Sequence, residues 1–142
     1  MRRVLAVASG GGHWAQLQLI APAFETCDLI FASPQAANAQ VLPLTDCNLR
    51  QPLRVLRCAL QVTSLIARTR PHLVVSTGAA PGALAVVIGK LFGARTVWID
   101  SVANVQRMSL SGRAVRRFSD LWLTQWPDLA TQSGAGFAGR VL

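Results

Sequence analysis

The sequence contains few acidic residues, almost no lysine and no tyrosine. Its 142 residues include six Asp and Glu, two His and a single lysine, Lys90, so arginine supplies nearly all of the formal charge of +8. Because only 14% of the residues are charged and 51% are hydrophobic, a disordered chain is excluded. This arginine excess favours nucleic acid, anionic lipid headgroups or a phosphorylated substrate as the partner, although a biased genome composition produces the same count.

Cysteine and long apolar segments are scarce as well. The three cysteines, Cys27, Cys47 and Cys58, form no C-x-x-C pair and have no histidine at metal-ligand spacing, which predicts reduced thiols and no metal site. The longest apolar run, residues 79–92, is interrupted by Lys90 and is shorter than the roughly 20 residues that cross a bilayer. Only five apolar residues precede the first glycines, too few for a signal peptide. We therefore expect a cytoplasmic protein whose membrane contacts are peripheral.

Strand-like and helix-like segments alternate along the chain. Short apolar runs that end in polar or glycine-rich turns predict strands at residues 4–8, 28–33, 41–44, 73–77, 96–100, 120–124 and, at the edge, 139–142. Helices are predicted between them at residues 14–24, 52–69 and 113–118, with a turn at 125–127, and residues 79–82 lead into a further, nearly all-apolar helix that runs through Phe92. This alternation predicts a single domain, residues 1–142, of the α/β class with a doubly wound, mainly parallel sheet.

A glycine-rich loop follows the first strand and leads into the first helix. Glycines allow a sharp turn, and free N–H groups at a helix start attract phosphate, so an anion site is predicted at Ser9, Gly10, Gly11, Gly12 and His13. A dinucleotide fingerprint is disfavoured, since Ala15 takes the place of the third glycine and the second strand ends at Ser33 and Pro34 without an acidic residue. In a parallel sheet, this loop meets segments 76–82 and 100–111 at the carboxyl ends of the strands, where ligands bind.

The predicted helix at residues 52–69 has one narrow polar stripe. Its polar side chains are three and four residues apart, which aligns them along the helix: Arg54, Arg57, Gln61, Ser64 and Arg68. The remaining surface is apolar. Either this helix packs into the core with a solvated stripe, or its apolar face meets a membrane while Arg54 and Arg57 reach lipid headgroups.

Five short motifs occur in a recognisable order: Ala8–His13, Ser76–Ala79, Trp98–Ser101, Ser109–Arg113 and Gln125–Pro127. In order and spacing they resemble the acceptor-side, membrane-recruiting subunit of a split GT-B glycosyltransferase. That family includes the accessory subunit of the dolichol-linked UDP-N-acetylglucosamine transferase and the PssD-type proteins of bacterial exopolysaccharide synthesis. The resemblance implies that this chain is the Rossmann-like amino-terminal half. A separate chain would supply the carboxyl-terminal half with the UDP-sugar, so no cofactor is expected on this one.

The resemblance also implies a reaction and a set of site residues. A sugar would pass with inversion from a UDP-sugar to a polyprenyl-diphosphate-linked saccharide at the inner face of the cell membrane, and a base would take the acceptor hydroxyl proton. His13 and Asp100 are the catalytic candidates. Instead of acting as the base, His13 could contact the diphosphate or only form hydrogen bonds within its own loop. Asp100 could instead only cap the following turn. The acceptor- and phosphate-binding candidates are Ser9, Gly10, Gly11, Gly12, Ser76, Thr77, Gly78, Ser101, Asn104, Arg107 and Arg113. Partner contact is expected at Gln125 and Trp126.

The sequence departs from the family pattern at three points. Asp100 stands where relatives commonly have glutamate, Asn104 stands where they often have arginine, and no tyrosine follows Ser109–Gly112. Another acceptor or donor, or reduced activity, accounts for such changes equally well. The competing hypothesis is a non-catalytic basic α/β module that binds nucleic acid or a phosphorylated ligand. We expect no nucleic-acid partner, because the basic and aromatic residues form no RNA-binding signature.

Overall fold

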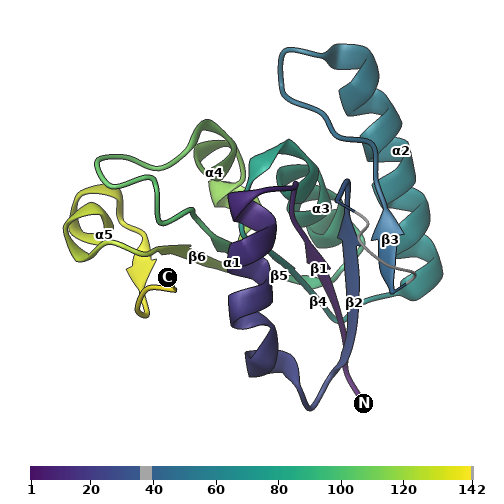
Figure 1. Cartoon of the computed structure of the whole chain (residues 1–142), viewed down its shortest axis with the longest axis horizontal. Coiled ribbons are helices and arrows are strands. Elements are labelled where there is room, and N and C mark those ends of the chain that lie inside the picture. Colours follow the sequence, from purple (N-terminus) through teal and green to yellow (C-terminus); the bar gives the residue numbers. More distant parts are fainter. Residues whose placement is uncertain (36–39, 142) are drawn as a thin grey trace.

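The computed structural model describes residues 1–35 and 40–141. Its centre is a parallel sheet with the strand order β3-β2-β1-β4-β5-β6-β7 (Figure 1). The strands are β1 (Arg3–Val7), β2 (Asp28–Ser33), β3 (Val41–Pro43), β4 (Leu73–Ser76), β5 (Arg95–Ile99), β6 (Leu121–Thr124) and β7 (Gly136–Phe137). The chain changes direction across the sheet between β1 and β4, which defines a doubly wound α/β fold and confirms the predicted class.

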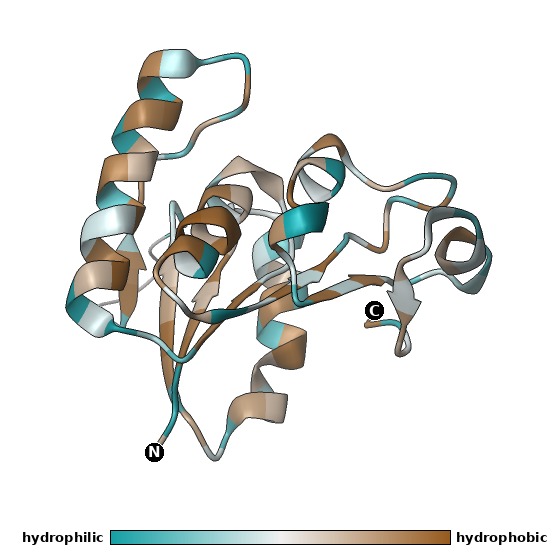
Figure 2. Cartoon of the chain, turned by 180° about the vertical axis from the view of Figure 1, so that it is seen from behind, coloured by the Kyte–Doolittle hydropathy of each residue, from teal (hydrophilic) through white to brown (hydrophobic). Residues whose placement is uncertain are grey.

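Helices cover both faces of the sheet. They are α1 (Gly12–Ile20), α2 (Pro52–Thr69), α3 (Ala79–Leu91), α4 (Leu110–Ala114) and α5 (Pro127–Ser133), with short 3-10 turns η1 (Ala21–Phe24) and η2 (Arg116–Phe118). Side chains alternate along β1, so that Val4 and Ala6 pack with α1 while Leu5 and Val7 pack with α2 and α3. Figure 2 shows the strands and α3 coloured mainly as hydrophobic. None of the helices in the described part of the chain is long and apolar enough to cross a membrane.

The helix predicted at residues 113–118 is wrong in its position. Helix α4 begins earlier, because the Ser109 hydroxyl accepts a hydrogen bond from the Gly112 N–H at 2.9 Å and caps the helix start. At Val115 the backbone leaves the helical region (φ −94°, ψ 2°), and only the 3-10 turn η2 follows. The Ser109 cap therefore sets the start of this helix at Leu110, before the predicted start at residue 113.

The carboxyl-terminal region also differs from prediction. The expected turn at residues 125–127 leads into α5, which Pro127 starts and Asp128 supports in its first turn. Gly134 ends this helix in the left-handed conformation (φ 80°), and the chain then pairs briefly with β6 as β7. An edge strand at 139–142 is not found at residues 139–141, and position 142 lies outside the described residues.

Candidate functional site

The loops after β1 and β4 are joined at the point where the sheet changes direction. His13, in the first turn of α1, places its ring Nδ1 3.2 Å from the Thr77 carbonyl oxygen. In return, the Thr77 hydroxyl donates a hydrogen bond to the His13 carbonyl at 2.6 Å. Because a carbonyl only accepts, the Thr77 carbonyl favours the tautomer with hydrogen on Nδ1 and leaves Nε2 of His13 as an acceptor.

Gly78 allows this close approach of the two loops. Its φ of +145° is rarely adopted by other residues, and a Cβ at this position would overlap Nδ1 of His13. The next residue, Ala79, also has a positive φ, of 67°. A positive φ costs energy in residues other than glycine, and such strained residues cluster at functional sites. The surrounding structure therefore holds Ala79 in a conformation that it would not adopt by itself.

A cavity of about 290 Å³ opens beside His13 at the carboxyl ends of the strands. We refer to it as the switch-point cavity; its wall is formed by His13, Ala79, Ser101, Ala103, Asn104, Ser109, Leu110 and Ser111. No carboxylate and no arginine lines it, among the residues that the structure describes. Helices α1 and α3 both begin here, and the positive ends of their dipoles favour an anion in the cavity.

Asp100 lies behind the cavity wall and is 1% exposed. Its Oδ1 accepts hydrogen bonds from the Ser109 hydroxyl (2.6 Å) and the Trp98 indole N–H (3.1 Å), and its Oδ2 accepts one from the Ser109 backbone N–H (2.9 Å). The carboxylate thus holds the residue that caps α4. The geometry therefore supports the second role considered for Asp100, holding the turn that follows it. Asp100 is not among the residues that line the cavity.

A buried glutamine pair, which sequence reasoning missed, supports the same wall. Gln16 donates through Nε2 to the Ser101 hydroxyl (3.1 Å) and accepts at Oε1 from Nε2 of Gln125 (2.7 Å). Gln125 also donates to the Asp100 carbonyl at 2.9 Å. The available signal was weak: Gln16 lies one turn after His13, but the same helix also has Gln18, which is exposed.

Gln125 was expected to contact a partner chain, and the structure corrects this. The side chain is only 2% exposed, because both of its polar atoms are used inside the domain, with Oε1 accepting the Val141 N–H at 2.8 Å. Trp126 is half-buried; its indole N–H donates to the Val102 carbonyl (2.7 Å), and the Arg140 guanidinium lies 4.9 Å above its ring. Partner contact at Trp126 stays a prediction.

The glycine loop is less open than its sequence indicates. The Gly11 N–H donates to the side-chain oxygen of Gln35 at 2.8 Å, so this group of the predicted cradle already has a partner. Ser9 is nearly buried at 9% exposure. The N–H groups in the first turn of α1 have no helical partner, as at every helix start, and these remain available to an anion.

The other candidate residues divide into supports and surface groups. Ser76 and Thr77 are fully buried; the Ser76 hydroxyl accepts the Gly78 N–H at 3.1 Å, so both side chains hold loops rather than line the cavity. Arg107 and Arg113 are exposed, and neither lines the switch-point cavity. Of the predicted ligand-binding side chains, the structure places His13, Ser101 and Asn104 together at the cavity.

Helix α2 has its buried residues mainly in its second half and its exposed leucines in its first half. Val62, Leu65 and Ile66 belong to the core. By contrast, three leucines on one side of the first half are 82%, 56% and 64% exposed; we call Leu53, Leu56 and Leu60 the leucine row. Arg54 and Arg57 are exposed beside it. Figure 1 shows the start of α2 rising beyond the carboxyl ends of the strands, the side on which α1 and α3 begin.

Comparison with known structures supports the fold. MurG of Acinetobacter baumannii superposes with a TM-score of 0.74 and 11% identity, covering 90% of this chain and 43% of that one. UDP-N-acetylglucosamine 2-epimerase of Rickettsia bellii superposes with a TM-score of 0.74 and 10% identity, covering 96% of this chain and 43% of that one. At this identity the likeness concerns the fold alone. It confirms the prediction of a Rossmann-like domain resembling the amino-terminal half of GT-B enzymes.

Sequence comparison identifies the family. "UDP-N-acetylglucosamine transferase subunit ALG14" of Eremothecium gossypii is 38% identical over 88 residues, covering 52% of this chain and 38% of that protein. The mouse protein of the same name is 31% identical over 71 residues, covering 46% and 33%. The match therefore spans between 33% and 38% of the length of these relatives. The family described as "Oligosaccharide biosynthesis protein Alg14 like" matches residues 44–141. The chain belongs to this Alg14-like family.

Proposed function

We propose that this chain is the acceptor-side subunit of a two-component inverting glycosyltransferase. It binds a polyprenyl-diphosphate-linked saccharide, while a separate chain provides the carboxyl-terminal half that binds the UDP-sugar. The observation that carries the proposal is the switch-point cavity, where two helix starts and His13 meet on a chain of the Alg14-like family. These helix starts offer N–H groups to the acceptor diphosphate.

His13 is the proposed general base. With its Nδ1 hydrogen directed to the Thr77 carbonyl, Nε2 is free to accept the proton of the acceptor hydroxyl. The hydroxyl oxygen forms a bond to the anomeric carbon of the donor sugar as the bond from that carbon to UDP breaks, and UDP leaves with the electron pair. Thr77 and Gly78 position the ring, and Asp100 positions the α4 wall without touching the substrate.

The leucine row is the proposed membrane contact. Exposed leucines enter the headgroup region of a bilayer, and neighbouring arginines bind anionic headgroups. The leucine row lies in the first half of α2, and Figure 1 shows the start of α2 at the carboxyl ends of the strands, the edge that holds the switch-point cavity. On this proposal, a lipid-linked acceptor reaches the cavity from the inner face of the cell membrane. The three exposed leucines favour the membrane alternative over the solvated core helix for the first half of α2.

The proposed acceptor and donor are chosen from the family resemblance and from the names of the relatives. The resemblance to PssD-type proteins makes a bacterial exopolysaccharide precursor the proposed acceptor. The names of the matched relatives make UDP-N-acetylglucosamine the first donor to assay. Trp126, with Arg140 over its ring, is the proposed contact for the donor-binding chain.

The test is sugar transfer by this chain together with its donor-binding partner. With a polyprenyl-diphosphate-linked saccharide as acceptor, His13→Ala is expected to lower the transfer rate by about 10²- to 10⁴-fold, the range for loss of a general base. Gln18→Ala, an exposed change one turn further along α1, serves as the matched control. Full transfer by His13→Ala would sink the proposal. Salt-sensitive nucleic-acid binding without transfer would favour the non-catalytic module instead.

A further inference from the structure

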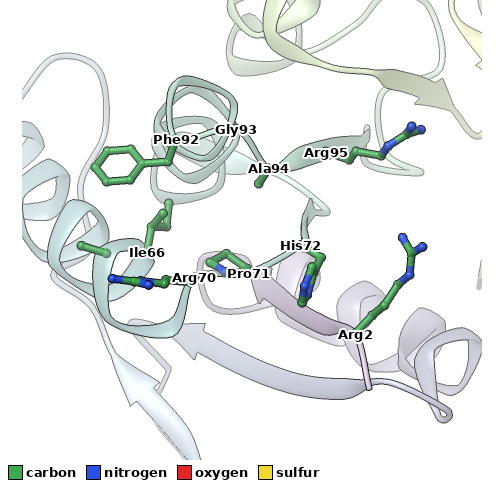
Figure 3. Close-up of a pocket in the computed structure, with 10 residues that line it drawn as sticks. Arg2, Ile66, Arg70, Pro71, His72, Phe92, Gly93, Ala94 and Arg95 are labelled. Atoms are coloured by element: carbon green, nitrogen blue, oxygen red, sulfur yellow. The ribbon is translucent and has the colours of Figure 1, made fainter.

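A second cavity, of about 640 Å³, lies at the amino ends of the strands, the edge opposite the switch-point cavity. We call it the amino-edge cavity. Figure 3 shows the residues on its wall that matter here, Arg2, Ile66, Arg70, His72, Phe92 and Arg95. Its volume lies within the range of small-molecule sites. None of these residues belongs to the five sequence motifs, and the proposed sugar transfer uses none of them.

Sheet order explains why its basic groups gather. Arg2, His72 and Arg95 stand at the amino ends of β1, β4 and β5, which are neighbours in the sheet. The His72 N–H donates to the Arg3 carbonyl at 2.9 Å, and the Arg95 N–H donates to the His72 carbonyl at 3.0 Å. In Figure 3 the side chains of Arg2 and Arg95 lie on the same side of the cavity, with His72 between them and Arg70.

Arg3 fixes the backbone around this cavity. Its guanidinium donates two hydrogen bonds, at 3.3 and 3.2 Å, to the carbonyl of Arg70, which ends α2 in the left-handed conformation (φ 47°, ψ 61°). Its backbone N–H donates to Nδ1 of His72 at 3.0 Å. Since that nitrogen accepts, the neutral His72 ring carries its hydrogen on Nε2, which is then a donor.

The cavity is cationic. None of its lining residues is acidic, and the guanidinium groups of Arg2, Arg70 and Arg95 have no hydrogen bond or ion pair within residues 1–35 and 40–141. Two carboxylates of this edge, Asp28 at the start of β2 and Asp120 just before β6, stand on either side of the basic group. Asp28 pairs in register with Arg3, and Asp120 is bound to Lys90 at 2.6 Å.

We propose that the amino-edge cavity binds a soluble phosphate-bearing molecule of nucleotide size. The guanidinium groups of Arg2 and Arg95 and the Nε2 hydrogen of His72 bind the phosphate, while Phe92 and Ile66 offer an apolar wall to the rest of the ligand. The choice of a soluble ligand rests on the proposed membrane contact. The leucine row and the amino-edge cavity lie at opposite edges of the sheet, so one flat membrane does not reach both.

The test measures binding of UMP and of inorganic phosphate to the whole chain by isothermal titration calorimetry. Arg2→Gln and Arg95→Gln are each expected to weaken UMP binding by about tenfold, as loss of a charge-assisted hydrogen bond does. Arg117→Gln, which removes an exposed arginine from η2, is the matched control and leaves binding unchanged. Circular dichroism of each variant confirms the fold. If inorganic phosphate binds as tightly as UMP, the anion site is supported, but the proposed apolar contact between Phe92 and the rest of the ligand is wrong.

Three results overturn the proposal. The first is no binding of either probe. The second is UMP binding that His13→Ala weakens and Arg95→Gln does not, which places the nucleotide in the switch-point cavity. The third is that Arg95→Gln releases the chain from phosphatidylglycerol vesicles but leaves UMP binding unchanged. That result would mean that the amino-edge cavity contacts a membrane and not a soluble ligand. Sugar transfer is not measured here, so failure of this proposal leaves the proposed transferase role untouched.

Discussion

The two histidines of this chain occupy opposite edges of one sheet and have opposite hydrogen-bonding states. Nδ1 of His13 faces a carbonyl, so Nε2 is left as a proton acceptor; Nδ1 of His72 receives a backbone N–H, so Nε2 is left as a donor. The backbone partner therefore decides what each ring can do. One suits a base in the switch-point cavity, and the other suits an anion contact in the amino-edge cavity.

The two cavities also attract anions by different means. The switch-point cavity depends on helix starts and has no arginine in its described wall, whereas the amino-edge cavity depends on guanidinium groups. A site built from backbone is sensitive to geometry, and a site built from side chains is sensitive to charge and salt. Mutations that alter one without the other test this distinction.

The largest effect is expected for Gly78→Ala. The added Cβ would overlap the His13 ring at a φ of +145°, so we expect a loss of about 2–4 kcal/mol in the free energy of unfolding and at least about 10²-fold in transfer. Gly93→Ala is the matched control: its φ is +87°, but a Cβ there has no neighbour within 4 Å. Thermal denaturation and transfer assays distinguish the two. Equal losses in both variants would show that the His13 contact is irrelevant.

Asp100→Asn separates a positioning role from a catalytic one. The amide provides one acceptor where the carboxylate receives three hydrogen bonds, so we expect about 1–3 kcal/mol of destabilisation, with transfer falling through loss of the α4 wall. Asp46→Asn, an exposed change, is the control. A variant with unchanged stability and strongly reduced transfer would instead make Asp100 the base.

The leucine row contrasts with an exposed leucine at the other edge. Replacing Leu53 and Leu56 by glutamine is expected to weaken binding to phosphatidylglycerol vesicles by about 30-fold, from roughly 1 kcal/mol for each partly inserted side chain. Leu91→Gln, 73% exposed at the end of α3, is the control and is expected to change vesicle binding little. Cosedimentation gives the measurement. Equal losses in the two variants would mean that the membrane contact is not confined to α2.

The smallest effect concerns the Lys90–Asp120 pair at the amino edge. The hydrogen bond from Lys90 lowers the pKa of Asp120 below its usual value of 3.8. The pair therefore adds stability above the unfolded pKa, and this is lost as the pH falls through the folded pKa. Because both groups are more than a third exposed, Asp120→Asn should cost at most about 1 kcal/mol at neutral pH and nothing in acid. A pH-independent difference in melting temperature would contradict this.

Much of the carboxyl-edge site was predictable from sequence. Strands that end in Ser9–His13 and in Ser76–Gly78 bring both loops to the carboxyl edge of a parallel sheet, and the structure shows that β1 and β4 are neighbours, with Val7 beside Ser76. The residue types themselves also indicated the chemistry, because glycines allow a sharp turn and histidine can accept a proton. Local pattern was therefore sufficient to place His13 and residues 76–82 at the same edge of the sheet, and the contact of His13 with Thr77 is known from the structure alone.

Contacts over long sequence separations were not predictable. Gln16 and Gln125 are distant in the sequence, and no periodicity shows that two amides bond to each other in the core. The burial of Asp100 depends on where Ser109 and Trp98 lie in space. Helix α5 was hidden by Pro127, which marks a turn and a helix start equally well.

Ring NMR signals of the two histidines report where the acceptor binds, because each cavity contains one of them. A short-chain polyprenyl-diphosphate-linked N-acetylglucosamine is added to the chain and both rings are followed. If the acceptor binds at the switch-point cavity, the signals of His13 shift and those of His72 do not. A shift of His72 alone, or of neither ring, would contradict acceptor binding at the switch-point cavity.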